Sequence, residues 1–586
     1  MFKGLWRTSG KSAIVVALLT TSVLACAPAG TSSLPGASSA PAPVPEVRKT
    51  ITVGQLNTLK AFASWDFNDT SGGGATLVEI HAIGLVSMDN QGNRLGRLAA
   101  RMPSLDDGSV MILPDGRMQV TWTLRQGLTW QDGASFSADD LVFSWEVNRT
   151  PEIPVSGQQV NVVRNVDSVY ATDASTYVMV WKRPYYRALD MGIRNYWVFP
   201  KHLLAEAFQG DKQAFMAQPY FTTEYVHLGP FRIADFQAGV QQTFRRVDGY
   251  FLGRPKIDTV VIKNVRDPNA LFANLLAGAV DVVGERTLSG DLFLQLRDDW
   301  AQSGGGTVVD RQYNWRYLQV QHGQQWTRPL ELAQDVRVRR GLLRALDREA
   351  IRQFIYPGFD DTGADSFMLK ADSRAGIVGR PFSIYPFDPS RAAAELSDAG
   401  WQRASDGRML GRDGRQVQIE IRGSSTDMQG VALVADFWRR LGIDATELTV
   451  SGSTNEDPEF RATFPGVEST ARSSGEDIFP NFDGRVLSLP ENRWVGGNRM
   501  HYANPALDQL IDRVYSTIDQ NASGVILKDV GDIFAAEVPV LPLHFVMEFA
   551  AARQGVRALV DEFASGVGSS SSPGLSARNA HLWDRD

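Results

Sequence analysis

The chain has 586 residues, of which 43% are hydrophobic and 21% charged, and its formal net charge at pH 7 is −7. This acidic balance argues against a nucleic-acid partner, because nucleic-acid binding relies on basic patches. The single cysteine excludes an intrachain disulfide and a zinc site of the Cys/His type.

The first 25 residues have the pattern of a secretory signal. Lys3, Arg7 and Lys11 precede the apolar run 12–25, which is shorter than the roughly 20 residues that a membrane span needs. The run ends in Val-Leu-Ala-Cys26, which resembles the lipobox of bacterial lipoproteins. We therefore predict a lipoprotein signal peptide over residues 1–25 and lipidation of Cys26. The alternative is an ordinary signal with a coincidental cysteine.

Residues 27–49 are rich in proline, alanine, serine and glycine. Such a segment cannot bury enough apolar surface to fold, so we expect residues 26–49 to form a disordered tether. Lipid on Cys26 would hold the exported chain on the outer face of the cytoplasmic membrane, facing the periplasm or the cell exterior.

The first elements after the tether are strands and one helix. In residues 50–56 apolar and polar side chains alternate as in a strand. In residues 77–89 the apolar side chains have helical spacing, followed by a short strand. Residues 118–130 alternate with β-branched and aromatic side chains and are the clearest strand. An Asp-Gly turn then leads into a helix within 131–147, with Ser137 as its N-cap.

Three later helices are predicted by the residues at their ends. Segments 267–278 and 388–400 begin with Asp-Pro and end at glycine, and segment 504–514 begins with Asn-Pro. The other expected elements are strands at 257–265, 279–283 and 415–421, and a helix followed by a strand at 430–448. Strands that alternate with helices indicate an α/β fold.

Segment 122–146 carries the most specific motif of the chain. It contains, in order, Leu-Arg-x-Gly, an aromatic residue, Asp-Gly and Ala-x-Asp. The matching residues are Leu124, Arg125, Gly127, Trp130, Asp132, Gly133, Ala138 and Asp140. Further motifs follow at 229–233, 250–283, 335–351, 388–401 and 504–513. Together they resemble the extracellular solute-binding proteins of ABC importers, of the dipeptide- and oligopeptide-binding type (family 5), over nearly all of residues 50–553.

The resemblance implies a two-lobe, periplasmic-binding-protein type II-like fold with an enlarged first lobe and a central ligand cleft. The first lobe would hold residues 50–314, with residues 540–586 returning to it as the C-terminal segment and tail. The second would hold 315–539. Segments 314–322 and 538–546 would cross between the lobes. The lobes would close on the ligand by hinge motion, and the loaded monomer would dock on an ABC permease that works with a cytoplasmic ATPase.

The sequence lacks the motifs of common enzymes. It contains no Gly-x-Ser-x-Gly, His-Glu-x-x-His or Walker motif, and no two of its seven histidines have the spacing of metal ligands. We therefore predict no enzyme activity, no cofactor and no metal site.

The family's ligand anchor is an aspartate, which binds the ammonium group of a peptide in the peptide-binding relatives. Aligned without gaps, segment 463–479 places Ser473 or Ser474 at that position. Glu468, or Asp477 with a shift, could replace the anchor, or the segment could be a surface loop. Alternatively the ligand has no ammonium, as for the oligosaccharides, siderophores and nickel chelates that other family members carry.

Aromatic residues near the implied cleft could stack on a ligand or could simply pack within the lobes. The candidates are Trp65 and Phe67, with Asp66 as a charge partner, then Trp315 and Tyr317 in a crossing segment, and Trp494 before a Gly-Gly loop.

We thus predict a membrane-tethered substrate-binding lipoprotein of an ABC importer that captures peptides. Two alternatives remain open. One is the same receptor role for an oligosaccharide, a siderophore or a metal chelate. The other is a sensor or chaperone-like lipoprotein that no longer takes part in transport.

Overall fold

The computed structural model of the chain describes residues 48–57, 61–62, 77–88, 93–154, 157–359, 363, 365–451, 454, 457–557 and 577–586. The predicted signal peptide, Cys26 and the tether up to residue 47 lie outside the described residues, as do Trp65, Asp66 and Phe67. The described residues belong to the unit Arg48–Asp586.

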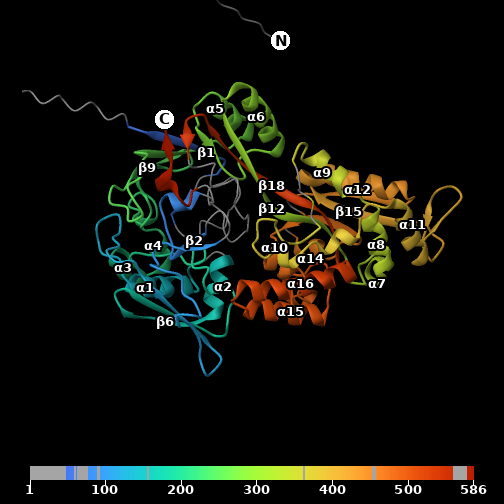
Figure 1. The fold of residues 1–586 in the computed structure, drawn as a ribbon, viewed down its shortest axis with the longest axis horizontal. Helices are drawn as coiled ribbons and strands as arrows, with labels where there is room; N and C mark the ends of the chain where they lie inside the picture. Colours follow the sequence, from blue (N-terminus) through green and yellow to red (C-terminus); the bar gives the residue numbers. More distant parts are fainter. Residues whose placement is uncertain are drawn as a thin grey trace, which may run out of the picture. The chain divides into compact units, whose positions relative to one another are not determined.

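Ten of the described strands form one sheet with parallel and antiparallel pairs (Figure 1). Their order across the sheet is β16 (Asp444–Val450), β15 (Gln418–Ser424), β17 (Val467–Arg472), β12 (Gly306–Val320), β18 (Val540–Arg553), β11 (Val282–Val283), β1 (Thr50–Gln55), β10 (Thr259–Asn264), β9 (Gln241–Arg246) and β8 (Phe231–Gln237). Strands from distant parts of the chain are therefore neighbours in this sheet.

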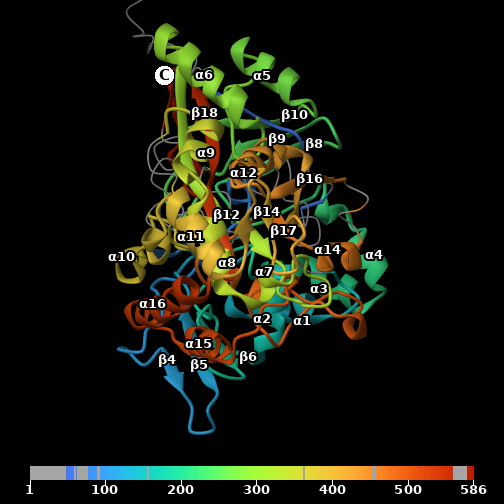
Figure 2. The same cartoon turned by 90° about the vertical axis from the view of Figure 1, so that its right-hand side faces the viewer.

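The long strands β12 and β18 lie in the middle of the strand order and join the two halves of the sheet. They pair antiparallel from Gly306↔Arg553 to Gln319↔Val540, with a register shift between Gln312 and Trp315. On its other edge β12 pairs with β17, and β18 pairs with β11 on its other edge. Figure 2 shows the red strand β18 beside β12, as does Figure 1. Most of the predicted crossing segments, 314–322 and 538–546, falls within these two strands.

A second, antiparallel sheet has the order β4 (Val110–Ile112), β5 (Met118–Thr123), β7 (Thr176–Trp181) and β6 (Val166–Asp173). Three two-stranded sheets complete the described strands: β2 (Val86–Met88) with β3 (Arg94–Gly96), β13 (Gln402–Arg403) with β14 (Met409–Leu410), and β19 (Val556–Arg557) with β20 (Asp584–Arg585). The β19–β20 pair places the last described residues beside the end of the long strand β18.

The α-helices lie between these strands along the chain. The first group is α1 (Ala138–Arg149), α2 (Gly157–Asn165), α3 (Lys201–Gln209), α4 (Lys212–Met216), α5 (Pro268–Leu276) and α6 (Gly290–Ser303). The second is α7 (Glu331–Gln334), α8 (Val336–Arg344), α9 (Arg348–Ile355), α10 (Ala375–Val378), α11 (Pro389–Asp398), α12 (Met428–Arg440), α14 (Pro458–Ala462), α15 (Pro505–Ser516) and α16 (Gln520–Glu537). The chain therefore has the α/β composition that its pattern predicts.

The predicted helix ends are confirmed where caps were expected. The backbone N–H of Ser137, the N-cap of α1, donates to the Asp140 carboxylate at 2.9 Å. Asp267 accepts from Ala270 N–H at the start of α5, and Asp388 caps α11 in the same way. Gly278, just after α5, has a φ of 76°, which glycine adopts without the steric cost of a side chain.

The helical spacing of residues 77–89 gives less helix than it predicts. Residues 77–80 form a single 3-10 turn, and the extended strand β2 begins at Val86. Gly84 lies against the backbone of Ile193, where a Cβ atom would come within 2.4 Å. Close packing against another segment therefore holds this stretch extended, since tertiary contacts override a short helical pattern.

The buried apolar side chains form several clusters. One cluster draws only on residues between Trp315 and Phe545. The buried members of the other three come from 51–300 and 547–583, with Phe359 as the exception. The two halves of the ten-stranded sheet, on either side of β12 and β18 in the strand order, thus pack against largely separate cores. β12 and β18 contribute to both.

Candidate ligand-binding cleft

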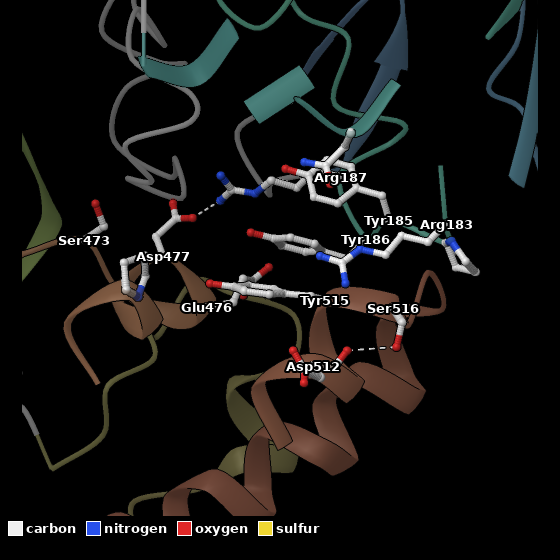
Figure 3. Close-up of a pocket in the computed structure, with 13 residues that line it drawn as sticks. Arg183, Tyr185, Tyr186, Arg187, Ser473, Glu476, Asp477, Asp512, Tyr515 and Ser516 are labelled. Atoms are coloured by element: carbon white, nitrogen blue, oxygen red, sulfur yellow. Dashed lines mark hydrogen bonds and ion pairs between the residues drawn. The ribbon is translucent and has the colours of Figure 1, made fainter. Parts of the chain in front are cut away.

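Two adjoining pockets lie between segments that are far apart in the sequence. The larger, about 410 Å³, is lined by residues 183–187 on one side and by residues of α15 and of the 3-10 helix Gly475–Asn481 on the other (Figure 3). The smaller, about 130 Å³, shares Arg187, Glu476 and Asp477 with it. These shared residues form the boundary between the two pockets. We call the two pockets together the cleft.

Stacked aromatic rings connect the two walls of the larger pocket. Trp181 stacks on Tyr185 with ring centroids 5.2 Å apart, and Tyr185 meets Tyr186 edge to face, also at 5.2 Å. Across the pocket, Tyr186 stacks on Tyr515 at 5.0 Å, and Tyr515 contacts Phe479 at 5.9 Å. The backbone N–H of Tyr186 donates to the Tyr515 carbonyl at 2.9 Å. The walls are therefore in direct contact through both rings and backbone.

An ion pair joins the same two walls. The guanidinium of Arg187 donates to the carboxylate of Asp477, with 19% and 11% of the two side chains exposed (Figure 3). Arg187 also lies 3.9 Å from Asp190, which binds Arg94. Such a partly buried pair is stabilising only while both partners remain, because either charge alone would be poorly solvated.

The series of charges continues on the second wall. Arg374 binds the carboxylates of Asp372 and Glu476, each at 2.8 Å. Burial, the largest single influence, would raise the pKa of Glu476, but the charge and hydrogen bond of Arg374 together with the charge of Arg187 outweigh it and hold that pKa below its ordinary value. Glu476 is therefore ionised at neutral pH, and positive and negative charges alternate across the cleft.

The residues predicted around the family's anchor position fall partly in the cleft. Asp477 lines both pockets, Ser473 lines the larger one and Ser474 the smaller one. Glu468 lies on β17 and lines neither, and burial raises the pKa of its carboxyl. The structure therefore brings Asp477, Ser473 and Ser474 together but leaves Glu468 apart from them.

The predicted aromatic residues lie elsewhere. Trp315 and Tyr317 are fully buried in the cluster between Trp315 and Phe545, with ring centroids 4.6 Å apart. Trp494 meets Trp326 edge to face at 5.7 Å. None of the three lines the two pockets. Their role toward a ligand stays a prediction, and that of Trp65, Asp66 and Phe67 concerns residues outside the described ones.

Sequence reasoning missed segment 183–187, Arg-Pro-Tyr-Tyr-Arg, which supplies one wall of the larger pocket. The available signal was its composition. Two tyrosines and two arginines lie one residue after the end of the apolar strand β7, where a connecting loop would be expected to be small and polar. Such side chains in a loop suit ligand or interface contacts.

No group of three or more His, Cys, Asp or Glu residues in the described ranges could hold a metal ion. None of the described helices is long and apolar enough to cross a membrane.

Comparison with known proteins identifies one family. Residues 112–471 match the model described as bacterial extracellular solute-binding proteins, family 5 Middle. The chain is 22% identical over 451 residues to the oligopeptide-binding protein AppA of Bacillus subtilis, covering 74% of this chain and 76% of that protein. It is 23% identical over 466 residues to the dipeptide-binding protein of Escherichia coli, covering 75% of this chain and 80% of that protein.

Solved structures show the same fold over most of the chain. The oligopeptide-binding protein of Thermus thermophilus complexed with a pentapeptide has a TM-score of 0.64 at 19% identity, covering 92% of this chain and 96% of its own. NikA of Brucella suis in complex with Fe(III)-EDTA has a TM-score of 0.69 at 18% identity, covering 92% and 100%.

Proposed function

Because the chain belongs to the bacterial extracellular solute-binding proteins of family 5, we propose that it captures a peptide in the cleft and delivers it to an ABC permease. The family and its α/β, periplasmic-binding-protein type II-like fold are those predicted from the sequence. Since this family consists of binding proteins, the prediction that the chain is not an enzyme is also confirmed.

The observation that carries the peptide proposal is the two-walled cleft. It combines tyrosine rings from both walls with the arginines of one wall, Arg183 and Arg187, and the acids of the other, among them Glu476 and Asp477. A peptide has an ammonium group, a carboxylate and side chains that rings can cover, so this combination suits it. The two walls also bind each other directly, through the ion pair of Arg187 and Asp477.

Strand β17 supports the proposal by offering a free edge. One edge pairs with β12 from Trp315↔Arg472 to Val320↔Val467, whereas the other pairs with β15 only at Val467 and Glu468. No other described strand continues that second edge toward Arg472. The next residue, Ser473, lines the larger pocket. An extended peptide could add to this edge, and its backbone hydrogen bonds would give affinity with little sequence preference.

The lobes of the receptor are part of the proposal. We place residues 50–314 and 540–586 in the first lobe and 315–539 in the second, because the buried clusters divide near these positions. β12 and β18 would then be the connections between lobes, and the register shift near Trp315 would lie at the hinge. The cleft residues 183–187 and 473–516 would belong to opposite lobes.

A second candidate cargo is a solute without an ammonium group. Ser473 and Ser474 stand where the resemblance implies an acid, and the nearby Asp477 already binds Arg187. NikA of Brucella suis, which shares the fold, was solved with Fe(III)-EDTA. A chelate or another anionic solute could use the arginines of the cleft instead.

Native mass spectrometry of the gently purified protein tests the cargo. A ladder of peptide masses released on denaturation is the expected result. A single non-peptide mass would favour the second candidate. The matched control is a sample that has been unfolded, washed and refolded, which should carry no such masses.

We also propose that the protein is held on the outer face of the cytoplasmic membrane by lipid on Cys26. Cys26→Ser should move the protein from the detergent phase to the aqueous phase in detergent partitioning, because the acyl chains attach only through this thiol. The control is Ser32→Ala, in the predicted tether. An unchanged distribution of the Cys26→Ser protein would remove the anchor from the proposal.

A further inference from the structure

The acids that line the larger pocket are all matched by arginines. Each carboxylate binds at least one guanidinium; the pairs are Asp477–Arg187, Glu476–Arg374 at 2.8 Å and Asp512–Arg485 at 2.6 Å. These carboxylates therefore have less capacity to bind a cation of the cargo than the number of acids suggests.

Arg183 differs from the other charged residues of this pocket. It has no hydrogen bond or ion pair with any residue in the described ranges, whereas Arg187 is shared by Asp477 and Asp190. Figure 3 shows the Arg183 side chain extending into the pocket beside Tyr186 and Tyr515. The pocket thus contains one guanidinium whose donors remain available.

The position of Arg183 is fixed by its neighbours in the sequence. It is separated from the end of strand β7 only by Lys182 and precedes Pro184, which also lines the pocket. A residue before proline is restricted to extended backbone, so the backbone of Arg183 has little freedom. Arg183 is exposed, so a ligand entering the cleft can reach it.

Guanidinium donors select planar anions. The five N–H groups form a rigid fork that binds both oxygens of a carboxylate, and such charge-assisted hydrogen bonds are stronger than neutral ones. The volume of about 410 Å³ is larger than a carboxylate alone requires, so part of the cargo would enter with it. The stacked rings of Tyr186 and Tyr515 provide an apolar wall for that part.

We propose that the larger pocket is a subsite for a carboxylate group of the cargo and that Arg183 is the residue that binds it. This inference rests on the proposed function, because the cargo would be held in the same cleft. The carboxylate could be the C-terminus of a peptide or a group of an organic acid, and both share the chemistry that Arg183 recognises.

The test uses two tripeptide libraries that are identical except at the C-terminus, where one has a carboxylate and the other a carboxamide. Binding is measured by native mass spectrometry with the wild-type protein, Arg183→Gln, Arg183→Lys and the control Arg149→Gln. Arg149 is exposed in the last turn of α1 and lines neither pocket. A parallel thermal-shift titration uses citrate as a carboxylate that is not a peptide.

The wild type should retain the free acids about tenfold or more better than the amides, the effect expected for one charge-assisted hydrogen bond. Arg183→Gln should abolish this preference, Arg183→Lys should restore part of it and Arg149→Gln should leave it intact. Equal retention of acids and amides by the wild type would overturn the carboxylate subsite while leaving peptide capture in place. A preference that persists in Arg183→Gln would overturn the role of Arg183.

Failure of the peptide proposal gives a different result. If the wild type retains neither library, peptide capture is contradicted, and citrate then decides the subsite. Stabilisation by citrate that is lost in Arg183→Gln but kept in Arg149→Gln would support the subsite, since only a ligand of the folded state raises its melting temperature. Equal stabilisation of the wild type and Arg183→Gln, or none in either, would overturn it.

Discussion

At the scale of single residues, the ion pair between Arg187 and Asp477 is the contact with the clearest energetic consequence. Both side chains are largely buried, at 19% and 11% exposed, and they come from opposite walls of the cleft. Opening the cleft must separate them. The pair therefore stabilises the arrangement in which the two walls are in contact.

Asp477→Asn should lower the free energy of unfolding by about 1–3 kcal/mol, between the values for surface pairs and for fully buried ones. Urea unfolding of the ligand-free protein measures this. The matched control is Asp413→Asn, because the pair Asp413–Arg415 spans 3.9 Å and is 65% and 87% exposed. The control should change stability by less than about 0.5 kcal/mol. Equal losses in the two variants would show that the cleft pair does not hold the walls together.

Buried histidines should make the protein sensitive to mild acid. Burial lowers the pKa of His81, His322 and His544 to about 3 in each case. The folded protein therefore leaves them neutral at pH values where the unfolded chain protonates them, with a pKa near 6.5. Stability should be fully retained above about pH 6.5 and should fall as the pH drops toward 3, by about 1.4 kcal/mol per pH unit for each histidine.

Urea unfolding between pH 7.5 and pH 4.5 measures this slope. His81→Phe tests its cause, because His81 lies among aromatic rings and stacks on Phe244 at 5.4 Å. The variant should lose about 1.4 kcal/mol per pH unit of the slope, the share of one histidine. A slope that is the same in His81→Phe and in the wild type would assign the acid sensitivity to other groups.

At the scale of elements, helix ends are where the sequence was most informative. Asp388, Asp267 and Asn504 cap their helices as predicted, because capping depends on residues adjacent in the chain. The stretch 77–89 was less informative, since its helical spacing gives only a short 3-10 turn where Gly84 packs on Ile193. Local rules predict an element well only where no distant segment determines its shape.

The cap of α11 gives a direct test at this scale. Asp388 accepts a hydrogen bond from the Arg391 backbone N–H at 2.9 Å, so Asp388→Ala should cost about 1 kcal/mol. Asp388→Ser keeps an acceptor at the same position and should cost less. Thermal or urea unfolding measures both variants. If serine and alanine were equally destabilising, the loss would come from another interaction of Asp388.

The cleft itself could be predicted only in part. Segment 463–479 was identified through the resemblance, and Ser473, Ser474 and Asp477 do line the pockets. The opposite wall was missed because no local pattern relates residues 183–187 to Tyr515, which lies more than three hundred residues later. Likewise, nothing local distinguishes Trp315 in the core from a tryptophan that faces a ligand.

At the scale of the whole molecule, ligand binding should close the proposed lobes. The connections between them are β12 and β18, so the second lobe can rotate about these strands. Small-angle scattering of the protein with and without a ligand identified by mass spectrometry should show a smaller radius of gyration in the complex. The Asp477→Asn variant without ligand should be more open than the wild type. Identical profiles in all three samples would contradict closure about these strands.

The strand order of the ten-stranded sheet also has a consequence for biogenesis. β18, from residues 540–553, lies between β11 and β12, and β1 reaches β12 only through it. During synthesis the sheet therefore cannot be completed before β18 has been made, and such non-local pairing makes folding slow. Slow folding of this topology favours passage of the still unfolded chain through an export channel, which an extracytoplasmic protein of this family requires.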